Sequence, residues 1–600
     1  SSQEGSAWFQ GSKPEVISHL HSLESTNTKN NKNSSQEGSA WFQGSKPEVI
    51  SHLHSLESMN TMQTSNADRT IATGSSETNS TEPPHAEAAV PLKSWLAVVG
   101  SALGAFMAVL DIQITSSSLR DIQGTLGASV EEGSWISSSY LIAEIVTIPL
   151  TGWLSQVFST RLYVIVNTIL FVIFSMLCGT AHDLPSMILF RAAQGFTGGT
   201  LIPMSFSIIL SMLPPSKRPV GLAMFSVTAV FAPSIGPAVG GFLTENFGWQ
   251  SAFYLNLIPG AIMLALLAYS LPKVPMRLDL LKKNDIPGII FMALGLGSLT
   301  FTLEEGQRKD WLGSEIIQTT TALAITFLTL FLLRELRAKN PLVNLRLLAR
   351  RNFGIGSFAN TALGMALYGA VYLLPLYLGM VQGYNAWQIG QVMIWSGLPQ
   401  LLIIPLVPKL MGKIDPRIML SAGLMLFGIS CLMNSFMDHN YASDQFIASC
   451  IMRALGQPLI MIPLSMLATA GIEKEHTGSA SALFNMMRNL GGSIGIAIAS
   501  TLLIQREQFH SHRLGEHLTA TNLNLQQWLS TTAQNLQQRG LSLDSANQQS
   551  LQMLSENIRT EAYILAFNDV FLVLGIILFI AAGTSLFLKK PAGPGAEGAH

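Results

Sequence analysis

The feature that most constrains this chain is a succession of long apolar runs that begins near Trp95 and continues almost to the C-terminus. A helix needs about 20 mostly apolar residues to cross a bilayer, so these runs predict about fourteen membrane spans. Gly and Pro occur within several runs, which membrane helices tolerate because neighbouring helices satisfy the backbone. The predicted fold class is an all-α polytopic membrane protein. The runs lie near residues 94–116, 134–157, 162–181, 184–212, 218–243, 250–271, 286–303, 316–334, 353–380, 387–411, 417–436, 446–471, 478–504 and 567–589.

Composition excludes several other classes of protein. Only 12% of the 600 residues are charged, whereas soluble chains carry about 25%. A net charge of −1 offers no basic field for nucleic acid, and three cysteines exclude a disulfide scaffold. There is no P-loop motif for ATP hydrolysis and no clustered catalytic set. We therefore expect a transporter and no enzyme, with no cofactor and no metal. Its energy comes from an ion gradient, or transport is passive.

The first 92 residues hold almost no apolar run, which predicts a disordered cytoplasmic tail. Residues 1–25 recur without change at 34–58, and such perfect identity is unlike a structural repeat, whose units diverge. This tag-like duplication favours a cloning or expression remnant ahead of a natural start near Met59. The alternative is a tandem peptide that binds a partner. Residues 591–600 are predicted to form a second disordered tail.

Basic residues in the connections set the predicted orientation. One set of loops collects most of the Lys and Arg, which predicts that both termini are cytoplasmic. The opposite side carries one long loop, about 505–566, which is rich in Gln, Asn and Ser. Within it, residues 523–536 and 546–564 are predicted helical, and its histidines at 510, 512 and 517 fit a polar surface better than a metal site.

Two halves of the chain resemble each other weakly. The segment at 190–195 followed by Pro203 is similar to the segment at 452–457 followed by Pro463. One large class of secondary transporters is built from parallel repeats of six helices. We therefore predict a six-helix bundle at 93–272, a second at 350–590 that includes the long loop, and an inserted helix pair at 284–336.

Ionisable residues deep in apolar runs are costly and usually face a cavity or a partner. Asp111, Glu144 and Arg191 are the candidates for proton coupling, because a buried, intermittently wetted carboxylate exchanges protons near neutral pH. The alternative is that the two carboxylates pair with Arg191 or with backbone and hold helices together. Further candidates for a cavity or a tether between helices are Tyr140, Arg453 and Arg488.

Four segments resemble motifs of the fourteen-helix drug:proton antiporters of the major facilitator superfamily, the EmrB/QacA-type exporters. The resemblance covers about residues 93–590. Leu110–Thr115 resembles the first-helix motif "LDxTIVNVALP", with Asp111 as its acidic residue, and Arg191–Gly195 is similar to the fourth-helix "RxxQG", whose arginine is implicated in proton coupling in that family. The segment at 232–241 looks like the fifth-helix antiporter motif of exporters. The matching motif residues beyond Arg191 are Gln194, Gly195, Pro233, Gly236, Pro237, Gly240 and Gly241.

The fourth segment departs from its pattern. Residues 152–161, with Gly152 and Arg161 at its ends, occupy the place of "GxLaDrxGrk" between the second and third spans. Gln156 stands where the family has Asp, and Ser159 and Thr160 replace the second Gly and the first basic residue. This departure predicts a weaker or differently built charge lock between the halves on the cytoplasmic side.

The resemblance implies a function and partners. It implies the major facilitator fold and a proton-coupled antiporter that exports amphipathic small molecules, such as drugs, across a bacterial inner membrane. The long loop resembles that of Gram-negative members, which implies a tripartite system with a periplasmic adaptor and an outer-membrane channel. The alternative is a dedicated exporter of a metabolite, fatty acid or siderophore; a uniporter follows if Asp111 and Glu144 are only structural.

Overall fold

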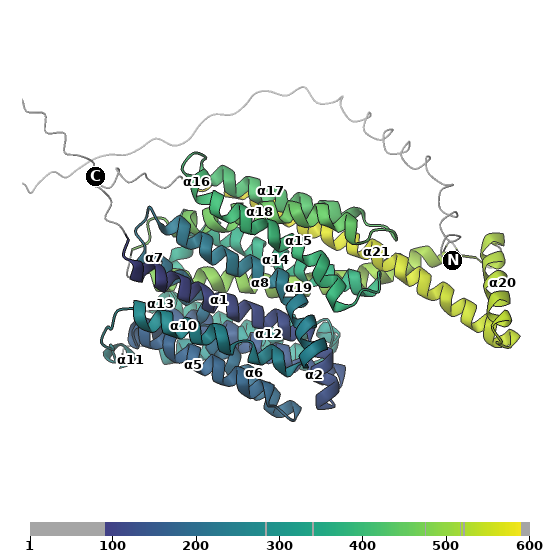
Figure 1. The fold of residues 1–600 in the computed structure, drawn as a ribbon, viewed down its shortest axis with the longest axis horizontal. Helices are drawn as coiled ribbons and strands as arrows, with labels where there is room; N and C mark the ends of the chain where they lie inside the picture. The colour runs from purple at the N-terminus through teal and green to yellow at the C-terminus, as the bar shows by residue number, and fades with distance from the viewer. Residues whose placement is uncertain are drawn as a thin grey trace, which may run out of the picture. The chain divides into compact units, whose positions relative to one another are not determined.

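The computed structural model describes residues 90–282, 285–338, 341–473, 476–516, 518–519 and 522–589. The duplicated segment, nearly all of the predicted N-terminal tail, the tail at 591–600 and His517 lie outside these residues. Every regular element in the described ranges is a helix (Figure 1), which confirms the predicted all-α class.

The number of spans agrees with the sequence prediction. Among the described residues, 13 helices are long and apolar enough to cross a membrane, and a bent helix raises the number to 14. This helix, α8 (Arg218–Phe247), bends by 49° between its parts Arg218–Pro233 and Ile235–Phe247. Pro233 and Pro237 explain the bend, because proline removes a backbone donor and its ring pushes away the preceding turn.

The helices before the inserted pair cover residues 92–270. Their bounds are α1 (Leu92–Ser117), α2 (Leu119–Leu126), α3 (Val130–Gly133), α4 (Trp135–Val157), α5 (Thr160–Gly179), α6 (Leu184–Gly198), α7 (Leu201–Met212), α8, α9 (Gln250–Tyr254) and α10 (Leu257–Ser270). Helices α6 and α7 form one span, and so do α9 and α10.

The remaining helices are the inserted pair and the second half. Their bounds are α11 (Asp279–Lys282), α12 (Ile286–Glu305), η1 (Trp311–Gly313), α13 (Glu315–Arg337), η2 (Leu345–Ala349), α14 (Arg351–Met380), α15 (Ala386–Ile403), η3 (Ile404–Leu406), α16 (Val407–Met411), α17 (Pro416–Met433), η4 (Asn434–Phe436), α18 (Ser443–Thr469), α19 (Thr477–Glu516), α20 (Leu523–Gln538) and α21 (Leu543–Ser585).

Packing joins the helices into two neighbourhoods. Helix α1 packs on α7, α8 and α10, and α6 packs on α4 and α5. In the second half α14 packs on α19 and α21, and α17 packs on α18 and α21. The neighbourhoods meet where α4 and α7 contact α19 and where α8 contacts α15. The boundaries of the two bundles at 93–272 and 350–590 stay predictions.

The inserted helices α12 and α13 pack on each other, and α12 also contacts α4 and α19. Asp285 caps α12 by accepting from the Gly288 backbone N–H at 3.1 Å, and its carboxylate pairs with Arg334 of α13 at 2.7 Å. The Asp285 side chain therefore both caps the N-terminus of α12 and links α12 to α13.

The structure extends two span helices through most of the predicted long loop. Helix α19 continues to Glu516, and α21 begins already at Leu543. Between Gly495 and Gly515 the chain becomes polar but contains neither Gly nor Pro, so nothing in it interrupts the helix. The helical stretches predicted at 523–536 and 546–564 are confirmed. Helix α20 lies against the start of α21 through Ala533, Leu536 and Ala546.

Candidate functional site

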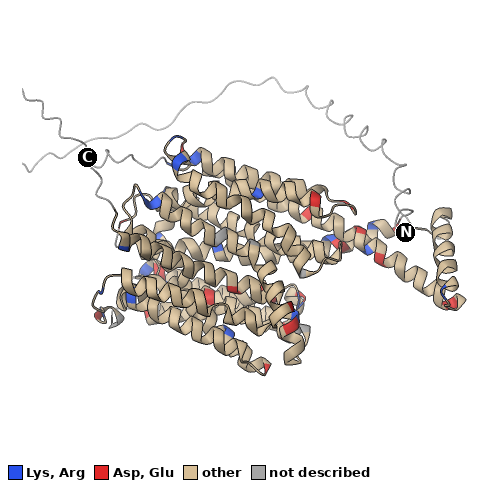
Figure 2. Cartoon of the chain, in the orientation of Figure 1, with Lys and Arg blue, Asp and Glu red and all other residues tan. Residues whose placement is uncertain are grey.

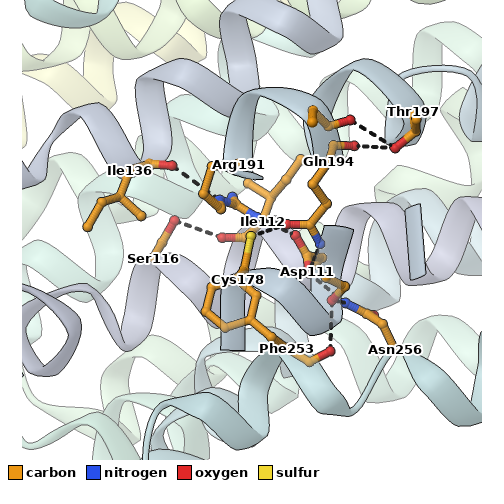
Figure 3. A network of polar contacts seen from close by, with 12 residues as sticks. Asp111, Ile112, Ser116, Ile136, Cys178, Arg191, Gln194, Thr197, Phe253 and Asn256 are labelled. Carbon is orange, nitrogen blue, oxygen red and sulfur yellow. Dashed lines mark hydrogen bonds and ion pairs between the residues drawn. The ribbon is translucent and has the colours of Figure 1, made fainter. Parts of the chain in front are cut away.

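A buried carboxylate forms the centre of the candidate site. Asp111 of α1 is 2% exposed and pairs with Arg191 of α6, whose Nη1 donates to Oδ2 at 2.8 Å. The other carboxylate oxygen accepts from Gln194 Nε2 at 2.9 Å and from Asn256 Nδ2 at 2.6 Å. Figure 3 shows these four side chains converging. The three donors satisfy a charge that would be costly to bury alone.

The Arg191 side chain interacts with groups from more than one neighbouring helix. It is 1% exposed, its Nε donates to the Ile136 carbonyl at 3.2 Å, and its Nη1 also donates to Gln194 Oε1 at 2.7 Å. Its guanidinium lies 4.3 Å from the centre of the Tyr140 ring, close enough for a cation–π contact. The arginine therefore links α6 to both α1 and α4.

The sequence prediction missed part of this network. Asn256, between α9 and α10, donates to Asp111 and also to Ser175 Oγ at 3.0 Å, and Ser175 donates to the Phe253 carbonyl at 2.7 Å. Cys178 Sγ donates weakly to Gln194 Oε1 at 3.6 Å. The signal was available, because an asparagine inside an apolar run is a polar group that needs a partner.

Gly195 of the "RxxQG" segment and Gly199, which follows the last residue of α6, let α6 approach α4 closely. A Cβ on Gly195 would clash with the Tyr140 backbone, and one on Gly199 would lie 2.8 Å from the Glu144 carbonyl oxygen. Close approach through small residues is how membrane helices pack. Gly195 thus allows the Arg191 side chain to lie against Tyr140. Tyr140 precedes Glu144 by one helical turn.

Glu144 is buried, 4% exposed, in the middle of α4. Among the described residues it forms no ion pair within 4 Å, unlike Asp111. The cations that act on it most strongly are Arg488 of α19 and then Arg191. Glu144 is therefore within electrostatic range of one arginine from each half.

The fifth-helix motif places its glycines against α1. A Cβ on Gly236 would clash with Gln113, and one on Gly240 would clash with Ser117 and lie 3.0 Å from the Ile114 Cα. Pro233 and Gly241 are buried, and Pro237 is half-buried. The motif therefore brings α8 into close contact with the helix that carries Asp111.

The segment at 152–161 contacts the second half. A Cβ on Gly152 would lie 2.9 Å from the Gly478 carbonyl oxygen of α19, and Gln156 is exposed beside that contact. Arg161 donates to the Leu271 carbonyl at 2.7 Å, within the first half. In this part of the described chain the contact between halves is backbone packing of two glycines and no ion pair.

The two remaining arginines lie in the second half without acidic partners. Arg453 of α18 and Arg488 of α19 are 4% and 3% exposed. Neither forms an ion pair within 4 Å, and neither Nε has a hydrogen-bond partner among the described residues. Arg488 lies 6.0 Å from the centre of the Phe225 ring of α8, and Arg453 lies beside Cys431 and Cys450.

Comparison with known proteins agrees with this architecture. The family described as the Major Facilitator Superfamily matches residues 101–496. The colistin resistance protein EmrB of Acinetobacter baumannii is 33% identical over 507 residues, which cover 84% of this chain and 98% of that protein. The multidrug export protein EmrB of Escherichia coli K12 is 31% identical over 510 residues, covering 84% of this chain and 97% of that one.

One solved structure supports the fold. The MFS proton:xylose symporter XylE, bound to 6-bromo-6-deoxy-D-glucose, superposes with a TM-score of 0.52 at 13% identity and covers 82% of this chain and 94% of its own. At that identity the likeness concerns the fold alone. The chain belongs to the Major Facilitator Superfamily, in its EmrB-like branch.

Proposed function

We propose that this protein is a proton-coupled antiporter that exports amphipathic small molecules such as drugs. The observation that carries the proposal is the buried ion pair between Asp111 and Arg191. The Arg191 guanidinium also lies on the Tyr140 ring, and the buried Glu144 follows Tyr140 by one helical turn. Relatives named for multidrug export and colistin resistance support the substrate class. The energy source is the proton gradient, and no cofactor is required.

In this proposal the two carboxylates share one arginine. Protonation of Asp111 removes the charge that holds Arg191, and the guanidinium then turns toward Glu144, which lies within its electrostatic reach. Among the described residues, no cation lies within 4 Å of Glu144 to offset the cost of burying its own charge. Proton binding is thereby linked to the contacts between α1, α4 and α6, and through Arg488 of α19 to the second half.

A proteoliposome assay tests the coupling. The purified chain is reconstituted, a pH gradient is imposed, and transport of an amphipathic fluorescent dye is followed. Wild-type flux is expected to scale with the gradient, and Glu144→Gln and Asp111→Asn to lose that dependence. Asp285→Asn is the matched control, because it neutralises a carboxylate of the inserted pair. Flux that ignores the gradient in the wild type, or that is unchanged in both variants, contradicts the proposal.

We further propose that the protein lies in a bacterial inner membrane with both termini cytoplasmic. Lys and Arg gather at the end of the bundle near α7 and α16, at the upper left of Figure 2, whereas both charge signs mix at the other end. Positive charge marks the cytoplasmic side. Labelling with a membrane-impermeant maleimide is expected to modify Ser530→Cys in intact cells stripped of their outer membrane, and Ser216→Cys only after lysis.

The extension made by α20 and the outer parts of α19 and α21 is the proposed contact with a periplasmic adaptor, which in turn reaches an outer-membrane channel. Arg506 of α19 pairs with Asp569 of α21 at 2.5 Å, and His510 bonds to the same carboxylate at 2.8 Å. These contacts fix the direction in which the extension leaves the bundle. Crosslinking from Ser530→Cys to a coexpressed adaptor tests the contact; full export after deletion of 523–538 argues against it.

A further inference from the structure

Two adjacent glutamates at the end of the inserted helix α12 take no part in the proposed proton coupling. Glu305 is 1% exposed, and its Oε1 accepts from Ser138 Oγ of α4 at 3.0 Å. Its Oε2 is buried and has no hydrogen-bond partner among the described residues. A buried carboxylate oxygen without a donor is costly, so Glu305 Oε2 is free to accept from a donor or to pair with a cation.

The neighbouring carboxylate faces the other half of the molecule. Glu304 contacts Ser493 of α19, and Tyr372 of α14 lies within electrostatic range of Glu304 and Arg308. The acidic end of α12 therefore lies where α12 contacts α4 of the first half and α19 of the second. Transporters of this architecture hold their substrates between repeats near the bilayer midplane; Glu304 and Glu305 lie at the same interface but at the end of their span.

The charges at this site do not balance. Arg308 is the only cation in the described chain within 4 Å of either glutamate; its Nη1 is 3.6 Å from Glu305 Oε1 and its side chain is 40% exposed. An ion pair of that length and exposure contributes little. Among the described residues, two carboxyl groups therefore share one loosely placed guanidinium at this end of α12.

Aromatic rings lie on the same helix contact. Trp135 of α4 stacks on Phe301 of α12 with ring centres 5.1 Å apart. Phe301 precedes Glu305 by one helical turn, and Trp135 precedes Ser138 by nearly one turn, so the rings and the Ser138–Glu305 bond share one face. Aromatic faces and carboxylates together favour lipophilic cations, since rings attract cations through their quadrupole.

We propose that Glu304 and Glu305 form a binding site for the positive charge of a lipophilic organic monocation, at the interface between the two halves. The inference rests on the proposed export function, for which it names one substrate class. The site is separate from Asp111 and Glu144, so cations and protons bind at different carboxylates.

A pair of probes of similar size tests the charge preference. Binding of tetraphenylphosphonium, a monocation, and of triphenylphosphine oxide, which is neutral, is measured by equilibrium dialysis on the full chain purified in detergent. We expect Glu305→Gln and Glu304→Gln to weaken tetraphenylphosphonium binding by about tenfold and to leave triphenylphosphine oxide binding unchanged. Glu315→Gln, an exposed acidic residue at the start of α13, is the matched control and is expected to bind both probes like the wild type.

A gain of affinity provides the second test. Arg308→Gln removes the cation that competes for the site, so tetraphenylphosphonium binding is expected to tighten severalfold, a result that misfolding cannot produce. Unchanged tetraphenylphosphonium binding in Glu305→Gln and Arg308→Gln, or equal loss of both probes, overturns the inference. Gradient-driven export of the neutral probe is measured in parallel; if it persists while cation binding shows no dependence on these residues, the inference fails and the proposed function stands.

Discussion

Arg191 and Arg453 show that two buried arginines at corresponding positions can differ in whether an acidic side chain pairs with them. Arg191 and Arg453 occupy corresponding places in the two similar segments of the sequence, but in the part of the chain that the structure describes only Arg191 of the two has an acidic partner. The sequence predicted Asp111 and Arg191 from their type and position, and Gln194 from the resemblance of its segment to a family motif. It did not predict Asn256, because nothing local links that asparagine to a residue 145 positions earlier.

Removing the charge of Asp111 is expected to destabilise the fold. Asp111→Asn leaves Arg191 buried without a counter-ion, which costs about 3–5 kcal/mol. Asp285→Asn is the control, because its partner Arg334 is 49% exposed and the loss there is about 1 kcal/mol or less. Thermal unfolding in detergent measures both. Equal changes in melting temperature would show that Asp111 and Arg191 do not depend on each other.

Asn256 is expected to contribute through its two hydrogen bonds. Asn256→Ala leaves Asp111 Oδ1 with one donor fewer and costs about 1–3 kcal/mol. Asn246→Ala removes an exposed asparagine that bonds only to the Phe242 carbonyl in its own helix, so its change is expected within about 0.5 kcal/mol. Denaturant titration of both variants provides the comparison, and similar midpoints would contradict the role of Asn256.

At the scale of the helices, small residues decide which elements lie close together. Gly195 and Gly199 place α6 against α4, and Gly236 and Gly240 place α8 against α1. Two motifs that the sequence identified by resemblance therefore have a direct packing role. The helices themselves were predictable from hydropathy and length, and their order along the chain is as predicted.

Adding one methyl group at the α4–α6 contact tests this packing. Gly195→Ala places a Cβ against the Tyr140 backbone, which cannot move aside cheaply, and is expected to cost about 1–3 kcal/mol. Gly124→Ala, in α2 with nothing within 4 Å of the added Cβ, is expected to be neutral or to stabilise by about 0.4–1 kcal/mol. Melting temperatures that move in the same direction would contradict the close approach.

At the scale of the whole molecule, contacts between α19 and the first half hold this conformation. Phe206 of α7 stacks on Phe484 of α19 with ring centres 5.7 Å apart, and Ser481 donates to the Pro203 carbonyl at 2.8 Å. Gly152 and Gly478 add a backbone contact on the same two sides. An alternating-access carrier has to break such contacts in each cycle.

Locking this interface is expected to stop transport. In Phe206→Cys/Phe484→Cys, oxidation is expected to join α7 to α19 and to abolish dye flux in proteoliposomes, and a reductant to restore it. Cys178, Cys431 and Cys450 are buried, so the wild type should respond little to the oxidant. The two single variants are the controls; full transport by the crosslinked protein would show that the interface does not open.

The sequence by itself determined the all-helical membrane class, the places of the spans and the short list of buried charges, because each depends on local composition and on the cost of exposing polar groups to lipid. Only the tertiary structure decided which charges meet. It paired Asp111 with Arg191, left Arg488 as a cationic neighbour of Glu144, and set Glu304 and Glu305 between the halves. Such contacts join residues far apart in the chain, and helix packing alone sets their distances.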